Sequence, residues 1–193
     1  EYGFCHVTIR DVLYGSLLRE ARVDLHARAT RALETTYADR LAEHMDALAD
    51  HSFAGELWPE TARYQLAASV RAVAGSANRH AIDCIERGLA ALERMGDGAS
   101  VARLGIDMRL AALAAHMPLG NMDEVLDLVR QAQEIAETTG DQRRLGAVYS
   151  QVATASWYTA NYDAAVEAAG RALEIAASER DGGLRMRATY NLG

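Results

Sequence analysis

A stretch of this chain that begins at Asn121 returns forty residues later, at Asn161. Both copies start with Asn-x-Asp, have alanine at the twelfth position and end in Glu-Ile-Ala. A unit that recurs at such an interval, roughly 20 to 50 residues, is typical of repeat proteins, in which each unit stacks only on its neighbours. The sequence therefore predicts an all-α solenoid, a right-handed superhelix of antiparallel helix pairs.

Apolar residues recur three or four positions apart along almost the whole chain, which is the period of an amphipathic helix. Proline occurs only twice, so few positions interrupt this pattern. Asn121 followed by Glu124 is typical of a helix start, and Gly120 favours a left-handed end of the preceding helix. We expect ten helices and no strands, with the helices near residues 6–18, 20–36, 38–52, 58–75, 77–95, 100–117, 121–139, 142–159, 161–179 and 183–193.

The composition and charge of the chain limit the kinds of molecule that we expect it to bind. The chain has 193 residues, half of them hydrophobic, which is enough for one elongated domain or two small ones. Its 27 acidic and 20 basic side chains leave a net charge of −7, and the arginines are scattered, so we expect no direct contact with nucleic acid. No run approaches the roughly 20 apolar residues of a membrane helix, and no signal peptide opens the chain. We therefore expect a cytoplasmic protein without membrane contact.

The sequence contains no arrangement that predicts catalysis or a cofactor. It has no lysine, which excludes a phosphate-binding loop of the G-x-x-x-x-G-K-[ST] type and Schiff-base chemistry within these residues. Cys5 and Cys84 are expected to be buried free thiols, and neither is assigned a histidine as its base. The row Glu43, Asp46 and Asp50 is interpreted as a solvated helix face. We expect no catalytic residue in this chain.

The histidines do not predict a metal site. His44 and His51 are seven residues apart on one helical face, which places their rings roughly 10 Å apart along the axis. Zinc requires three or four converging ligands, so this pair is too widely spaced. His26, His80 and His116 are expected to be isolated residues on helices.

Residues 161–165, with the sequence Asn-Tyr-Asp-Ala-Ala, and residues 190–193 resemble the tetratricopeptide repeat (TPR) pattern. The match is fainter over 76–89 and departs at Val125, where the pattern has alanine. The forty-residue period is also longer than the usual period of about 34. The resemblance implies a TPR-like solenoid whose open concave face binds protein or peptide.

The same resemblance implies which side chains line that concave face. Aromatic residues there would anchor a partner, because they bring a large contact area at little entropic cost. The alternative is that Trp157 or Tyr158 packs against the next unit. The implied groove residues are Ala147, Ser150, Thr154, Trp157, Tyr158, Arg187 and Tyr190, with Asp107 and Arg103 as an extension.

The first eighteen residues carry a second resemblance. Phe4-Cys-His6, the Arg10-Asp11 pair, Tyr14 and Ser16-Leu-Leu are similar to the segment that closes the ATPase module of large bacterial signalling proteins. This implies that residues 1–36 are the helical remnant of an ATPase lid and that 37–193 are repeats, the last one truncated. His6 would then contact the nucleotide of that ATPase; alternatively, it caps or packs the first helix.

These resemblances imply that the chain is part of a larger protein. Such proteins are commonly class III adenylate/guanylate cyclases with a regulatory ATP-binding module, or LuxR-type ATP-dependent transcriptional regulators, and both continue into TPR-like helices. We expect a non-catalytic regulatory module that binds a protein or peptide, which could be its own upstream ATPase domain. The parent is expected to be a cyclase acting in cyclic nucleotide signalling, with the LuxR-type regulator and a self-association scaffold as alternatives.

Overall fold

The computed structural model describes the backbone of residues 7–190 and the side chains of residues 12–190. Within this range the chain is helical throughout and has no strand, as the sequence predicts. The elements are α1 (Val7–Ser16), α2 (Arg19–Thr36), the 3₁₀ helix η1 (Leu41–His44), α3 (Met45–Ala54), α4 (Trp58–Ala74), α5 (Asn78–Met95), α6 (Ala99–His116), the 3₁₀ helix η2 (Met117–Leu119), α7 (Met122–Thr139), α8 (Gln142–Tyr158), α9 (Tyr162–Ser178) and α10 (Gly182–Tyr190).

The helix expected over 38–52 differs most from the structure. The chain turns after α2, where the N–H of Arg40 donates to the carbonyl of Tyr37 at 2.8 Å, and continues as the 3₁₀ helix η1. Only at Met45 does the α-helix α3 begin, and it extends two residues beyond the expected end, to Ala54. None of the described helices is long and apolar enough to cross a membrane.

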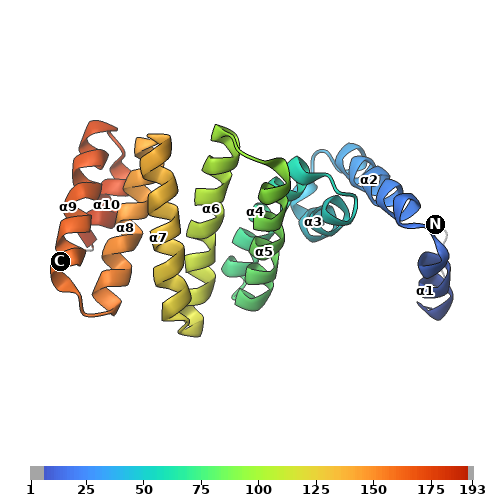
Figure 1. The fold of residues 1–193 in the computed structure, drawn as a ribbon, viewed down its shortest axis with the longest axis horizontal. Helices are drawn as coiled ribbons and strands as arrows, with labels where there is room; N and C mark the ends of the chain where they lie inside the picture. The colour runs from blue at the N-terminus through green and yellow to red at the C-terminus, as the bar shows by residue number, and fades with distance from the viewer. Residues whose placement is uncertain (1–6, 191–193) are drawn as a thin grey trace.

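The helices stand side by side in a row along the long axis of the molecule, from α1 at one end to α9 and α10 at the other (Figure 1). From α2 onward, each α-helix packs mainly on the α-helix before it and the α-helix after it. In addition, α4, α6, α8 and α10 contact one another in succession. The helices α5, α7 and α9 therefore lie on one side of a continuous line formed by α4, α6, α8 and α10.

The turns from α3 to α10 recur at a nearly constant interval, and each contains a residue with positive φ. After Ala160, for example, the N–H of Asn161 donates to the carbonyl of Ser156, which is the closing hydrogen bond of a Schellman motif. Counting along the chain, successive positive-φ residues are twenty positions apart, except for one interval of twenty-four that contains α6 and η2. They are Glu56, Ser76, Gly96, Gly120, Gly140, Ala160 and Arg180. A helix and its turn thus occupy twenty residues, and a pair of helices occupies the forty seen in the sequence.

The buried positions recur with the turns. In α5, α7 and α9, the fifth, ninth, twelfth and sixteenth residues after the positive-φ residue are all buried. They are Ala81, Ile85, Gly88 and Leu92 in α5, Val125, Val129, Ala132 and Ala136 in α7, and Ala165, Ala169, Ala172 and Ala176 in α9. Moreover, α7 lies between α6 and α8 as α9 lies between α8 and α10. The two copies of the sequence repeat therefore occupy equivalent surroundings.

The twelfth position of each unit holds a small residue because two helices approach closely there. A Cβ atom added to Gly88 would lie 2.6 Å from Cε of Met108 on α6. Ala132 and Ala172, at the matching places in α7 and α9, have no exposed surface. The alanine that both copies of the repeat have at the twelfth position is thus explained by the packing of the neighbouring helices.

The packing before α4 follows a different pattern. α2 packs chiefly on α3, whereas α3 contacts α2, α4 and, to a smaller extent, α5. The closest approach is at Gly55, where an added Cβ atom would lie 2.6 Å from the backbone nitrogen of Ala27. The helix α2 ends at Thr36, the expected end of the helix over 20–36.

Candidate polypeptide-binding site

A hollow of about 1140 Å³ lies between α8 and α10, at the end of the row of helices. We call it the α8–α10 hollow. One wall comes from the C-terminal half of α8 and the other from the exposed face of α10. It is lined by Ser150, Gln151, Thr154, Trp157, Tyr158, Gly182, Arg185, Met186, Arg187, Thr189 and Tyr190.

The structure brings six of the predicted groove residues together in this hollow. They are Ser150, Thr154, Trp157, Tyr158, Arg187 and Tyr190. The three aromatic side chains are largely exposed, with 60% of Trp157, 64% of Tyr158 and 85% of Tyr190 accessible to solvent. Ser150 is buried, and the hydroxyl of Thr154 donates to its carbonyl at 3.0 Å. The hollow therefore combines hydrogen-bonded polar residues of α8 with exposed aromatic side chains.

Trp157 contacts the next helix and remains exposed. Its ring meets the ring of Tyr162 at the start of α9 edge to face, with 5.2 Å between the ring centroids. Even so, most of the indole stays exposed, so the contact with α9 orients the side chain without covering it. An aromatic side chain held in this way offers contact area to a partner at a low cost in conformational entropy.

The charge of the hollow is opposite in sign to that of the whole chain. Among the described residues that line it, only Arg185 and Arg187 are charged, whereas the chain carries a net charge of −7. Both arginines are exposed, and within the described residues neither has a carboxylate within 4.0 Å. The wall formed by α10 thus presents two guanidinium groups beside an exposed Met186.

Asp107 and Arg103, expected as an extension of the groove, lie elsewhere and take part in an ion-pair network. Arg144 of α8 donates to both carboxylate oxygens of Asp107, at 2.9 and 2.6 Å, and to Asp141 at 2.8 Å. Arg103 lies 3.4 Å from the same Asp141 carboxylate. Hydrogen bonding to Asp107 raises the pKa of Arg144. These residues join α6 to the turn before α8 and do not line the hollow.

The sequence also assigned a role to His6, which lies outside the described residues. Ala147, the remaining expected groove residue, is partly buried on α8 and does not line the hollow. Sequence reasoning missed Arg185 and Met186, although α10 repeats the place of α8 forty residues on and so indicates which of its faces could be open.

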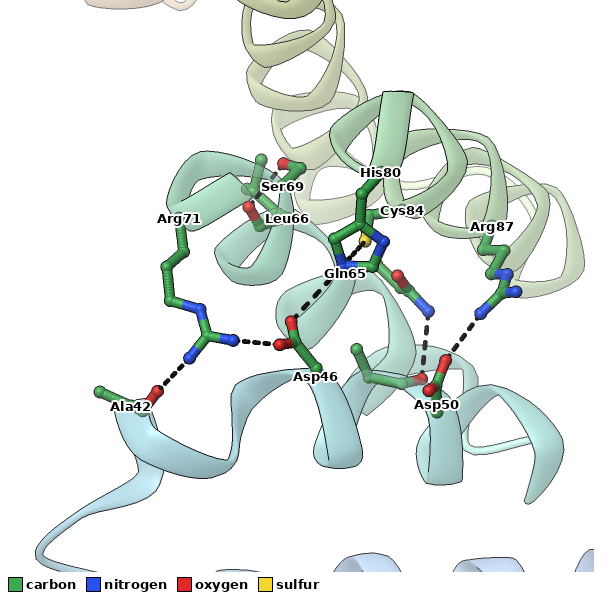
Figure 2. A network of polar contacts seen from close by, with 11 residues as sticks. Ala42, Asp46, Asp50, Gln65, Leu66, Ser69, Arg71, His80, Cys84 and Arg87 are labelled. Carbon is green, nitrogen blue, oxygen red and sulfur yellow. Dashed lines mark hydrogen bonds and ion pairs between the residues drawn. The ribbon is translucent and has the colours of Figure 1, made fainter. Parts of the chain in front are cut away.

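A second cluster of polar side chains joins α3, α4 and α5, and Figure 2 shows how its members face one another. Asp46 of α3 forms an ion pair with Arg71 of α4, which also donates to the carbonyl of Ala42 at 2.9 Å. The same carboxylate lies 3.6 Å from Nε2 of His80 on α5, and that nitrogen lies 3.7 Å from Sγ of Cys84. His80 and Cys84 are four residues apart on one helix face, a spacing that sequence reasoning overlooked.

This cluster has the chemistry of a structural contact. Burial raises the pKa of the Cys84 thiol to about 11, so the thiol stays protonated at neutral pH and is a poor nucleophile. Nε2 of His80 faces both Asp46 and Cys84, which is not the relay of a nucleophile, base and orienting acid, where each ring nitrogen has its own partner. Among the described residues, no three histidine, cysteine or carboxylate groups are placed to hold a metal ion.

The acidic row is exposed, as the sequence predicts, but the histidines are not all isolated. Asp50 accepts from Arg87 of α5 at 2.7 Å, so the row joins helices as well as facing solvent. His26 is not isolated, because its Nδ1 lies 2.7 Å from Nδ1 of His51 and its Nε2 lies 2.8 Å from the hydroxyl of Tyr14. Burial, and then the neighbouring His51, lower the pKa of His26. Sequence spacing could not reveal these pairs because their members lie on different helices.

Comparison of the chain with protein-family models, with curated proteins and with solved structures finds no match.

Proposed function

We propose that this chain is a non-catalytic, polypeptide-binding module of TPR-like repeats within a larger bacterial signalling protein. The observation that carries the proposal is the α8–α10 hollow, where exposed Trp157, Tyr158 and Tyr190 surround an opening between two helices that are one repeat apart. Tyrosine, tryptophan and arginine are the residue types that most often dominate binding energy at protein interfaces.

The regular packing supports a TPR-like solenoid as the architecture of this module. Three features found here are shared by such stacks: helix pairs of similar length, contacts between the first helices of successive pairs (α4, α6, α8 and α10), and the same four buried positions in the second helices (α5, α7 and α9). In a right-handed superhelix of this kind the first helices line the concave side. The α8–α10 hollow would then be part of a longer groove along α4, α6, α8 and α10.

The parent that we propose is an adenylate or guanylate cyclase, and the support is the resemblance of residues 2–18 to an ATPase lid. In such a protein the module would be cytoplasmic, and its bound partner, which could be the upstream ATPase domain, would shift the parent between inactive and active states. Such a shift requires the partner to bind one state more tightly than the other. A LuxR-type regulator would use the same module with a different output.

The proposal is tested by selecting peptides that bind the 193-residue chain from a random library and measuring their affinity for single variants. We expect Tyr158→Ala to weaken binding about 30-fold, the size of an interface hot spot of about 2 kcal/mol. Leu126→Ala is the matched control, because Leu126 is an exposed apolar residue, 42% accessible, on α7 and away from the hollow.

Circular dichroism of each variant verifies that the helices remain folded. The proposal fails if the selected peptides bind Tyr158→Ala as tightly as the wild type, or if the chain alone turns over a substrate. A stable oligomer in light scattering that blocks peptide binding would support the scaffold function instead.

A further inference from the structure

Polar contacts between side chains join the helices α2 to α5 into one set. Asp46 of α3 contacts Arg71 of α4 and His80 of α5, as Figure 2 shows. The ring of His26 on α2 contacts that of His51 on α3. Such contacts have a defined distance and direction, so they fix how these four helices lie against one another.

A second set of polar contacts joins the helices α6 to α9. They are Arg109–Gln131 between α6 and α7, Arg144–Asp107 between α6 and α8, and Arg171–Tyr149 between α8 and α9. Among the described residues, no side-chain hydrogen bond or ion pair joins a residue before Gly96 to a residue after Gly98. The two sets of helices are therefore separate with respect to polar contacts.

Apolar side chains fill the contact of α6 with α4 and α5, which we call the α6 interface. At its centre the fully buried Met108 faces Gly88, and the end of this unbranched, flexible side chain is the part that comes closest. Apolar attraction has no preferred direction, so α6 can slide by a small distance without losing a specific bond. The interface includes Ala62, Leu66, Ile85, Leu89, Leu92, Met95, Val101, Leu104, Met108, Ala111 and Ala112.

The connection between the two sets consists of Gly96, Asp97 and Gly98. Gly96 has φ 74° and ψ −160°, a conformation that is essentially restricted to glycine. Among the described residues, none accepts a hydrogen bond from the backbone N–H groups of these three residues, whereas in the preceding turn the N–H of Ala77 donates to the carbonyl of Ala72 at 2.8 Å. The backbone of the connection can therefore rotate without breaking a hydrogen bond of its own N–H groups.

We propose that residues 96–98 are a hinge, about which the helices after Gly98 move relative to those before Gly96 while α6 slides on α4 and α5. This is a shear of packed helices, in which the apolar core of the α6 interface stays buried. The movement changes the angle between α4 and α6, and with it the shape of the line formed by α4, α6, α8 and α10. The inference goes beyond the proposed function and holds whether or not the α8–α10 hollow binds a polypeptide.

The test measures distances between pairs of nitroxide spin labels by double electron–electron resonance in the 193-residue chain. The labels are attached to cysteines that replace Ala90, Glu134 and Glu174, three exposed residues that each lie fourteen positions after the positive-φ residue of their unit. The pair at 90 and 134 spans the hinge, and the pair at 134 and 174 is the matched control within the second set. We expect the distance distribution of the first pair to be about twofold wider.

Two further measurements complete this experiment. A pair at Arg31 and Ala90, both exposed, lies within the first set and should have a distribution as narrow as that of the control pair. All pairs are made in the Cys5→Ser/Cys84→Ala background, so that only the introduced cysteines are labelled. Circular dichroism verifies that this background keeps its helices, and Cys84→Val replaces Cys84→Ala if it does not.

A proline substitution tests whether residues 96–98 are the hinge. Ala99 is the first residue of α6, where proline fits, and the extended backbone of Gly98 before it, with φ 168° and ψ 155°, is compatible with a following proline. We expect Ala99→Pro to narrow the distribution of the pair at 90 and 134 by about a third, because the connection becomes stiffer. Gln142→Pro, at the first residue of α8, is the matched control and should leave this distribution unchanged.

The proposal is overturned if the pair that spans the hinge has a distribution no wider than those of the two pairs within the sets. Equally wide distributions for all three pairs would mean that the whole row bends evenly, and no hinge exists. If Ala99→Pro leaves the width unchanged, residues 96–98 do not control the movement and the proposal is also wrong.

Discussion

The two ends of this molecule hold their helices together by different means. Among the described residues, six polar side chains are buried, and five of them lie in α2, α3 and α4: Thr30, Ser52, Thr61, Gln65 and Ser69. Beyond Ala74 only Ser150 is of this kind, and the recurring core positions of α7 and α9 are valine and alanine. Of the five N-terminal side chains, only Gln65 donates to another helix, at the carbonyl of Ala49. Further individual contacts, such as Tyr64 with Glu34 and His26 with His51, join the helices of the N-terminal region, whereas a repeated apolar seam joins those of the C-terminal region.

This difference has a consequence for how each region tolerates change. An apolar seam is spread over many small contacts, so it resists the loss of one of them but not an increase in volume at a close crossing. A buried polar contact depends on one pair of atoms. It contributes more to the specificity with which two helices of the chain pair than to the free energy of unfolding. Substitutions matched between the two regions can test this interpretation.

The largest effect is expected from Gly55→Ala at the crossing of α3 and α2. The new methyl group would lie 2.6 Å from the backbone nitrogen of Ala27, and backbone cannot move aside as a side chain can. We expect the free energy of unfolding to fall by about 3 kcal/mol, the upper range for overpacking.

Gly75→Ala provides the control, because Gly75 occupies the same place in the next turn and its nearest neighbours would be 3.6 Å away. Chemical denaturation of the two variants gives the comparison. An equal loss of stability in both would contradict the close approach at Gly55.

A smaller loss is expected from Ala172→Leu in the repeated seam. Ala172 has no exposed surface and packs against Tyr149 and Leu184 of the neighbouring helices. Three extra carbon atoms should cost about 2 kcal/mol, because the facing helices would have to separate. Ala177→Leu, at an exposed position of the same helix, should change stability by less than about 0.5 kcal/mol. Similar melting temperatures for the two variants would show that the seam is loosely packed.

The seam is also the part of the fold that the sequence predicts well. The interval from Asn121 to Asn161 becomes two twenty-residue helix-and-turn units, and the small residues fall where helices cross. The conformations of the turns are harder to predict from the sequence. A positive φ is found at four residues that are not glycine, namely Glu56, Ser76, Ala160 and Arg180. Their backbone is held by the surrounding hydrogen bonds, such as the one from Asp181 to the carbonyl of Ala176, and side-chain type alone does not reveal this.

The site residues also divide into those whose position the sequence predicts and those whose contacts it does not predict. The aromatic and polar residues of α8 could be assigned to one face because helical spacing places them there. In contrast, Asp107 does not line the hollow and accepts hydrogen bonds from Arg144, which is thirty-seven residues along the chain. Likewise, the ring of His26 contacts that of His51, which is twenty-five residues away. Pairs of this kind depend on how two helices cross, and no local pattern in the sequence encodes the crossing.

In the polar region, Gln65→Met is expected to have almost no effect on stability. The amide of Gln65 donates to the carbonyl of Ala49 at 3.1 Å, but its buried oxygen has no partner among the described residues. Methionine keeps the volume while removing that oxygen, and the carbonyl of Ala49 keeps a bond from Ser52 at 3.1 Å. We expect a change within about 1 kcal/mol in either direction by thermal unfolding. A loss of about 3 kcal/mol would show that the polar contacts supply stability after all.

The smallest effect is a pH dependence below pH 6.5 that comes from His26 in the N-terminal region. Burial, together with His51, holds the pKa of His26 below its ordinary value of 6.5, so the folded protein keeps this ring neutral where the unfolded chain already binds a proton. The contribution to stability is therefore complete above pH 6.5 and is lost as the pH falls through 6.5 toward the lower pKa of the folded state.

Because His26 is partly exposed and solvent screens its charge, we expect the free energy of unfolding to fall by less than about 1 kcal/mol between pH 7 and pH 5. The relevant quantity is the difference between the wild type and His26→Gln, since other groups titrate in both. Tyr14→Phe should keep most of this difference, because it removes the hydrogen bond to Nε2 but leaves the contact with His51. If His26→Gln has the same pH profile as the wild type, the histidine pair does not couple protonation to folding, and the two regions differ in packing alone.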